Sequence, residues 1–159
     1  MVEAGADINR ATENGATPLH AAAGQGHIDV VRFLVEVGAD VNMAMADGAT
    51  PVREAAWDGH IEVVCFLVEA GADINKAMND GARPLYAAAA SGHIEVVCFF
   101  VEAGADINRA TENGATPLHA AAGQGHIDVV RFLVEAGADI NKAMNDGARP
   151  LYAAASTNN

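Results

Sequence analysis

Six histidines, two cysteines and 21 carboxylates are the side chains of this 159-residue sequence that can bind a metal or exchange a proton. A structural zinc site needs Cys and His residues in closely spaced pairs. The two cysteines, Cys65 and Cys98, are instead far apart in the chain. The histidines recur at fixed positions and form no such pairs with the cysteines: His20, His27, His60, His93, His119 and His126. We therefore expect structural histidines, with no metal and no other cofactor.

Catalytic chemistry also lacks a sequence pattern. A general acid or base needs a pKa shifted inside a cleft, but the carboxylates here lie beside glycines or at helix ends that water reaches. Serine occurs only at Ser91 and Ser156, and there is no nucleophile-elbow, Walker or metalloprotease motif. We expect no catalytic residue, and the sequence does not predict an enzyme.

Charge narrows the class of partner. The formal net charge is −12, whereas binding nucleic acid or an anionic membrane requires clustered Lys and Arg. An acidic field instead favours a basic protein partner. The sequence has no apolar run of the roughly 20 residues that cross a bilayer, and no basic leader with an apolar core. Two unpaired thiols suit a reducing compartment, so we predict an intracellular, cytoplasmic protein.

The elements that position these groups recur at one fixed period along the chain. The tripeptide Gly-Ala-Asp begins at Gly5, Gly38, Gly71, Gly104 and Gly137. The prolines recur with the same step of 33 residues: Pro18, Pro51, Pro84, Pro117 and Pro150. Residues 2–36 reappear unchanged at 101–135, and residues 66–89 at 132–155. A fixed period of this length indicates stacked copies of one supersecondary unit.

One unit can be interpreted residue by residue. Thr50 is a good helix N-cap, and Pro51 is tolerated at the first helical position. Gly59 can end that short helix in a left-handed conformation. Residues 61–68 form a second, almost entirely apolar helix, and the Asp-Gly pair at 80–81 is a hairpin-turn signal. The unit is helix, turn, helix and hairpin, and only stacked neighbours can cover its apolar side.

The Thr-Pro-Leu-His sequence at residues 17–20, the Gly-His at 26–27 and the Gly-Ala-Asp-Val-Asn at 38–42 resemble the ankyrin repeat, and the period matches it too. The resemblance implies an all-α solenoid of stacked helix-turn-helix units with protruding β-hairpin loops. We predict a single ankyrin-repeat domain over residues 1–159, divided into repeats 5–37, 38–70, 71–103, 104–136 and a partial repeat 137–159.

Some positions depart from the family pattern. The family usually places an Asp inside the hairpin, where this sequence has Thr12, Met45, Met78, Thr111 and Met144. We therefore predict that the hairpins lack the polar bond of that Asp and carry methionines near their tips. The second repeat has Val52-Arg53, and the third and fifth have Arg83 and Arg149 instead of Thr. Loss of the Thr N-cap costs about 1 kcal/mol, so we expect these repeats to be looser.

Both ends look incomplete. Met1–Ala4 reads as the last turn of a second helix, and the fifth repeat has a first helix only. The end faces should then expose apolar side chains, because solenoids need polar capping repeats. End-to-end self-association, fraying of the last repeat and truncation from a longer array are the three expected consequences.

In the ankyrin family, partners meet the hairpin tips and the exposed side of the first helices. The corresponding protein-binding candidates here are Trp57, Asp58, Arg53, Asp47, Arg83, Tyr86, Asn79, Asp80, Glu13, Asn14, Gln25, Glu112, Asn113 and Gln124. Trp57 is the only tryptophan and stands where other repeats have Gly24, Ala90 and Gly123. It is either a binding hot spot or an indole lying on its own repeat. Arg53, Arg83 and Tyr86 are either interface anchors or surface groups, the arginines paired with nearby carboxylates.

The resulting prediction is a non-catalytic protein–protein interaction module or scaffold. Its partner is a protein of unknown identity and basic character, and neither nucleic acid nor membrane is expected. The alternative is a self-associating structural protein, a homo-oligomer that stacks end to end through its uncapped terminal repeats.

Overall fold

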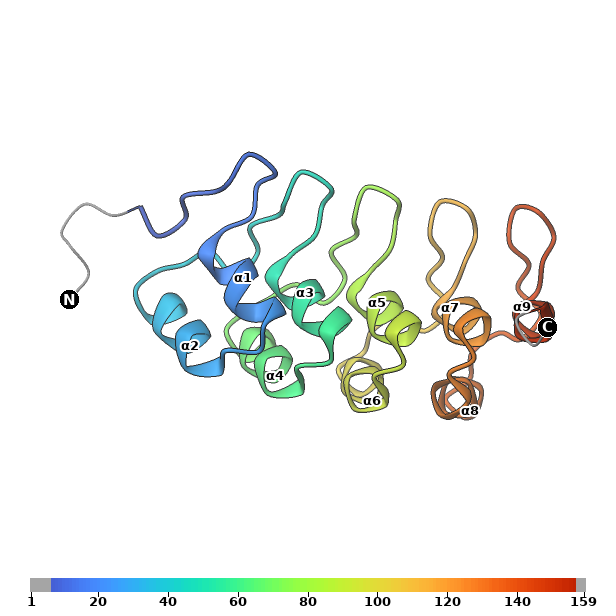
Figure 1. Ribbon diagram of the computed structural model, residues 1–159. Coiled ribbons are helices and arrows are strands. Elements are labelled where there is room, and N and C mark those ends of the chain that lie inside the picture. Colours follow the sequence, from blue (N-terminus) through green and yellow to red (C-terminus); the bar gives the residue numbers. More distant parts are fainter. Residues whose placement is uncertain (1–6, 157–159) are drawn as a thin grey trace.

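The protein is a row of paired helices in a computed structural model that describes residues 7–156 (Figure 1). The helices in that range are α1 (Pro18–Gly24), α2 (Ile28–Glu36), α3 (Pro51–Asp58), α4 (Ile61–Glu69), α5 (Pro84–Ser91), α6 (Ile94–Glu102), α7 (Pro117–Gln124), α8 (Ile127–Glu135) and α9 (Pro150–Ser156). Odd-numbered helices are the first helices of their repeats, and even-numbered helices are the second. The predicted all-α solenoid is confirmed. Within the described range the hairpins contain no strand, because each is only a tight turn.

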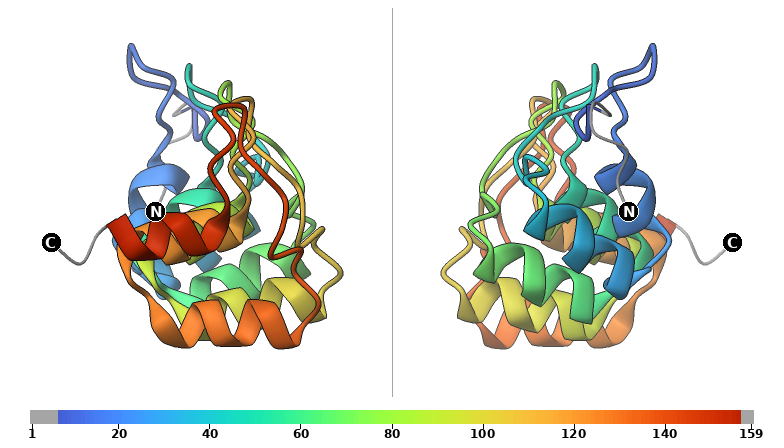
Figure 2. Two further views of the ribbon diagram at one scale, coloured as in Figure 1. Left: turned by 90° about the vertical axis from the view of Figure 1, so that its right-hand side faces the viewer. Right: turned by 90° about the vertical axis from the view of Figure 1, so that its left-hand side faces the viewer.

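The molecule has three layers, which the end-on views separate (Figure 2). Hairpins form one edge, first helices lie in the middle, and second helices form the opposite edge. First helices pack more extensively along the row than second helices do. Their Ala-rich surfaces explain this, since Ala55 and Ala88 are fully buried and let neighbouring helices approach closely. The first-helix layer is therefore the main contact between repeats.

The apolar core lies between the first and second helices and runs along the whole row. Val64, Leu67, Val97 and Phe100 are fully buried there. Each such side chain contributes about 1.5–3 kcal/mol relative to its exposure in water. The stripe that these residues form on each second helix has no other surface to cover it, so stacking and folding depend on each other.

First helices begin as their sequences predict. Thr50 Oγ1 accepts the Arg53 N–H at 3.4 Å, so α3 keeps its N-cap despite the altered tetrapeptide. The N-cap of α5 is Arg83, which forms no side-chain cap bond. The expected loss of a cap in the third repeat is therefore real, and the second repeat does not share it.

The Gly-His pairs connect one repeat to the next. Gly92 ends α5 with a left-handed φ of 78°, and a Cβ there would lie 2.5 Å from Nδ1 of His126. The glycine thus gives room to the imidazole of the following repeat. His126 Nε2 donates to the Ala90 carbonyl at 3.0 Å, and His60 and His93 bond to the preceding repeat in the same way.

The hairpins do have polar bonds, made by residues other than the family's Asp. In the second repeat, Asp47 accepts the Ala49 N–H at 2.9 Å, and Asp80 and Asp146 do the same in their hairpins. In the first repeat, the Thr12 hydroxyl accepts the Ala16 N–H at 3.1 Å, as Thr111 does in the fourth. An aspartate two residues after the family's Asp position therefore holds three of the turns, and a threonine at that position holds the other two. The hairpin methionines are half-buried and do not form the tips: Met45, Met78 and Met144.

Both end faces expose apolar side chains, as predicted. Val30 and Phe33 of α2 are 47% and 48% exposed at one end. Leu151 and Tyr152 of α9 are 60% and 70% exposed at the other. The expected helical turn at Met1–Ala4 lies outside the described residues.

Candidate functional site

The candidate residues lie where the family resemblance places them, on hairpins and first helices. We call this set the tip–helix surface; it comprises Glu13, Asn14, Gln25, Asp47, Arg53, Trp57, Asp58, Asn79, Asp80, Arg83, Tyr86, Glu112, Asn113 and Gln124. Most of them are exposed, whereas Arg53, Arg83 and Tyr86 are half-buried. First helices begin directly after the hairpins, so the hairpins and the first helices form two adjacent layers along the row (Figure 1).

Trp57 has the most distinctive surroundings of this set. Its indole is 42% exposed, and the Arg53 guanidinium carbon lies 4.9 Å from the ring centroid. Arg53 Nη1 also donates to Glu54 Oε1 at 2.8 Å. Arg53 thus pairs with a carboxylate, as one of its two alternatives expects, and also supports the aromatic ring. Its Nε is buried and has no hydrogen-bond partner among the described residues.

The residues beside Trp57 are small. A Cβ added to Gly24 of the preceding repeat would lie 3.5 Å from Asp58 Oδ2 and 3.7 Å from Glu54 Cβ. Ala90 of the following repeat is half-buried. The indole therefore stands between two repeats that offer no large side chain at the same position.

Several tip residues also have structural contacts. Asn79 Nδ2 donates to the Ala46 carbonyl of the preceding hairpin at 2.9 Å. Thr12 donates to Asn14, and Thr111 to Asn113, within the same hairpin. Arg83 Nε donates to the Asn75 carbonyl at 2.7 Å, so this arginine binds a backbone oxygen and not the expected carboxylate.

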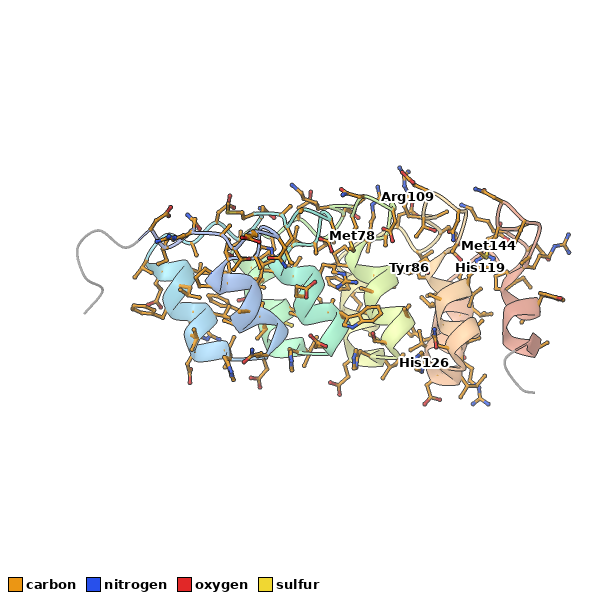
Figure 3. All side chains as sticks on the ribbon, turned by 45° about the horizontal axis from the view of Figure 1, so that its top comes forward. Met78, Tyr86, Arg109, His119, His126 and Met144 are labelled. Carbon is orange, nitrogen blue, oxygen red and sulfur yellow. The ribbon has the colours of Figure 1, made fainter. Side chains whose placement is uncertain are left out.

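The histidines at the start of first helices form buried networks. The Thr17 N–H donates to His20 Nδ1 at 3.2 Å, and His20 Nε2 donates to the Ala49 carbonyl at 3.2 Å. His119 forms the same network in the fourth repeat, and Figure 3 shows it toward the hairpin side of the helices, with His126 at the opposite edge. Burial lowers the pKa of His20 and of His119. Both ring nitrogens are occupied, so these histidines have structural roles.

The two cysteines and Tyr86 are half-buried. Cys65 and Cys98 are free thiols. Burial first, and then Glu69 or Glu102, raises the pKa of these thiols. Burial first, and then Asp80, raises the pKa of Tyr86. All three groups stay protonated at neutral pH, and within residues 7–156 no cluster of His, Cys, Asp and Glu is placed to hold a metal.

The pairing of Arg53 with a carboxylate was one of the expected alternatives, but two contacts between arginines and aromatic rings were missed. The first is that of Arg53 with Trp57. Arg32 lies 4.6 Å from the ring centroid of Phe66 on the second helix of the next repeat. The only hint of this second contact was that Phe66 follows the counterpart of Arg32, Cys65, directly in the next repeat.

Comparison with known families agrees with this architecture. A family model described as ankyrin repeats in three copies matches residues 1–78 and 85–159. A second, described as ankyrin repeats in many copies, matches residues 59–101. A search of curated proteins gave no match. In the described part of the chain, no helix is both long and apolar enough to cross a membrane.

Ankyrin repeats generally mediate protein–protein interactions, and proteins built from them are typically non-catalytic. The family match covers nearly all of the sequence, and the paired helices, Gly-His contacts and hairpins follow its period. The chain therefore belongs to the ankyrin-repeat family.

Proposed function

We propose that this chain is a non-catalytic module, one domain over residues 1–159, that binds a partner protein through the tip–helix surface. The observation that carries the proposal is the exposed indole of Trp57. Large aromatic side chains bury much area at little entropic cost, which is why tryptophan is enriched among binding hot spots.

The surroundings of Trp57 favour a binding role over a packing role. Arg53 covers part of the ring and is held by Glu54, so the indole is oriented before a partner arrives. The small residues Gly24 and Ala90 leave space on either side of it. Preorganised side chains lose less entropy on binding, so a contact with this indole gives up less of its binding energy to ordering.

The charge of this surface favours a basic partner. Asp58, Asp47 and Asp80 are exposed, and the net charge of the whole chain is −12. Opposite charges accelerate association at low ionic strength. The association rate should therefore fall as salt is added, and a rate independent of salt would contradict a basic partner.

Replacing the indole tests the proposal. Capture from a cell extract by the wild-type chain and by Trp57→Ala, read by mass spectrometry, should identify a partner that the variant loses. The dissociation constant of that partner should rise at least about 30-fold, the equivalent of 2 kcal/mol at a hot spot. Phe33→Ala is the matched control, because Phe33 is 48% exposed on the second-helix layer. Equal affinity of wild type and Trp57→Ala would reject Trp57 as an anchor.

A second candidate function is self-association through the end faces. Exposed Leu151 and Tyr152 at one end, and Pro18 and Ala21 at the other, favour it. A homo-oligomer that covers these faces would remove apolar surface from water. Its size should rise with concentration when no partner is present.

A further inference from the structure

The two ends of the row carry helices that already pack against each other inside the molecule. Helix α9 begins with the same Pro-Leu-Tyr-Ala-Ala-Ala sequence as α5. Helix α1 has the sequence of the first seven residues of α7. Helix α5 packs directly against α7 within the chain. A contact between α9 of one copy and α1 of another would therefore bring together side chains that form an established interface.

We propose that a second copy of this chain docks head to tail, with its α1 and first hairpin on α9 and the last hairpin, recreating the α5–α7 junction. This inference rests on self-association, the second function proposed above, and specifies the surfaces that meet. The occupant of the C-terminal face is the N-terminal face of another copy.

The hairpin backbone offers one matching hydrogen bond. At the internal junction the Glu112 N–H donates to the Asp80 carbonyl at 2.9 Å. The corresponding groups at the two ends are the Glu13 N–H and the Asp146 carbonyl. Neither takes part in such a bond among the described residues. Docking a second copy would join them and extend the row of tip-to-tip bonds.

The space for that hairpin is also present. A Cβ on Gly81 would lie 3.0 Å from the Glu112 nitrogen and 3.2 Å from the Thr111 Cα, so the next hairpin covers Gly81 closely. A Cβ on Gly147, the equivalent residue of the last hairpin, would have nothing within 4 Å. The space over Gly147 is therefore open, whereas the backbone of the next hairpin fills the equivalent space over Gly81.

The N-terminal face exposes side chains that are buried at the internal α5–α7 junction. Pro117 and Ala120 of α7 are buried at the internal junction, whereas the identical residues Pro18 and Ala21 of α1 are exposed. The second helix is present in both repeats, so the difference follows from the preceding repeat, which covers α7 and has no equivalent before α1 among the described residues. Pro18 and Ala21 are the side chains that α9 of another copy would cover.

A hollow at the C-terminal face would receive them. It has a volume of about 520 Å³ and is lined by Asp146–Arg149 and Tyr152. At the internal junction, the corresponding Arg83 and Tyr86 line a small gap together with Pro117 and Arg109 of the next repeat. Pro18 and Arg10 of a second copy would occupy the equivalent places at Arg149 and Tyr152.

The junction between copies comprises two of the three layers. Among residues 7–156 no second helix follows α9, so α8 does not reach α2 of the next copy. The intermolecular contact is therefore weaker than the internal one. It is also heterologous and does not close on itself, so it adds further copies as concentration rises.

Sedimentation velocity of the reduced chain, from about 10 µM to about 1 mM, covers the range of weak association. We expect the wild type to form dimers and longer species in this range. Gly147→Asn should weaken association at least about tenfold, because a side chain there meets the incoming hairpin backbone. Asn tolerates the left-handed φ of 85° at this position better than other residues do.

Gly137→Asn is the matched control. Gly137 also has a left-handed φ, of 95°, and nothing lies within 4 Å of its Cβ position. Its counterparts Gly38, Gly71 and Gly104 stay equally open although another repeat follows each of them. This variant should therefore associate like wild type. A wild type that stays monomeric throughout, or equal association of the two variants, would overturn the proposal.

Mixing two blocked variants tests the polarity of the contact. Glu13→Pro blocks the N-terminal face, because the proline ring replaces the N–H that would donate to the Asp146 carbonyl. The Gly15 N–H donates to the Thr12 carbonyl at 2.9 Å, so Glu13 is the second residue of a tight turn, where proline is favoured. Glu13→Pro and Gly147→Asn should each be monomeric alone and form a dimer when mixed, because each keeps one open face. Absence of the mixed dimer would reject head-to-tail docking. Trp57→Ala should self-associate normally, so failure of this proposal is distinguishable from failure of partner binding.

Discussion

The first and fourth repeats share one sequence over residues 2–36 and 101–135 but differ in what surrounds them. Their second helices begin alike, with backbone angles of −79° and 75° at His27 and −80° and 77° at His126. Val30 is nevertheless 47% exposed, whereas its counterpart Val129 is 1% exposed. Identical residues in identical local conformation can therefore be surface in one repeat and core in another.

Hydrogen bonding differs in the same way. His126 Nε2 donates to the Ala90 carbonyl of the preceding repeat. Among the described residues no repeat precedes His27, and its Nε2 lies 3.0 Å from Gln25 Oε1 in its own turn. In these two repeats the local sequence sets the backbone conformation, whereas the neighbouring repeat sets burial and long-range hydrogen bonds. This is the behaviour of a solenoid in which each repeat contacts only its neighbours.

The largest expected difference comes from placing a charge at the two equivalent valines. Val129→Asp should reduce the free energy of unfolding by more than about 3 kcal/mol, because it buries an unpaired carboxylate. Val30→Asp should change it by less than about 0.5 kcal/mol, as surface substitutions do. Both residues occupy the third position of their helices, so the helix dipole acts equally on both. Urea unfolding measures the difference, and equal losses would refute the neighbour argument.

A smaller difference is expected from restoring the N-cap in the third and fifth repeats. Arg83→Thr should stabilise the chain by about 0.5–1 kcal/mol, because Thr would cap α5 as Thr50 caps α3. Loss of the Arg83 bond to the Asn75 carbonyl offsets part of the gain. Arg149→Thr should have little effect on global unfolding, because end helices open locally first. Thermal unfolding of both variants provides the measurement, and a larger gain at Arg149 would contradict this ranking.

The smallest effect is expected from protonation of His20 and His119. Burial lowers the folded-state pKa of each from its ordinary value of 6.5, so the folded chain binds fewer protons than the unfolded chain. Their stabilising contribution is complete above pH 6.5 and is lost as pH falls below 6.5 toward the folded-state pKa. Urea unfolding between about pH 7.5 and pH 5 should show the decline.

The double variant His20→Tyr and His119→Tyr is the control for that decline, since Tyr86 occupies the same position in the third repeat. Its stability should depend less on pH than that of the wild type. An undiminished decline in the double variant would assign the effect to other groups.

The fold and the general location of the candidate site followed from the sequence. Glycine, proline and histidine at a fixed period specified the paired helices, because each acts on the backbone near it. The cap of α3 and the bonds of the hairpins were judged less well. Asp47 and Asp80 were taken for binding groups alone, although they also hold their turns. The role of Glu54 beside Trp57 required side-chain directions that the repeat period does not contain.

The sequence by itself determined the repeat, its helices and turns, and the acidic charge, because these depend on residue type and short-range spacing. Only the tertiary structure decided which of two identical residues is buried, which carbonyl a histidine binds, and which way Arg53 turns to meet Trp57. Burial and long-range hydrogen bonds are properties of pairs of repeats, and a chain with the same residues at both ends and in the middle gives them different neighbours.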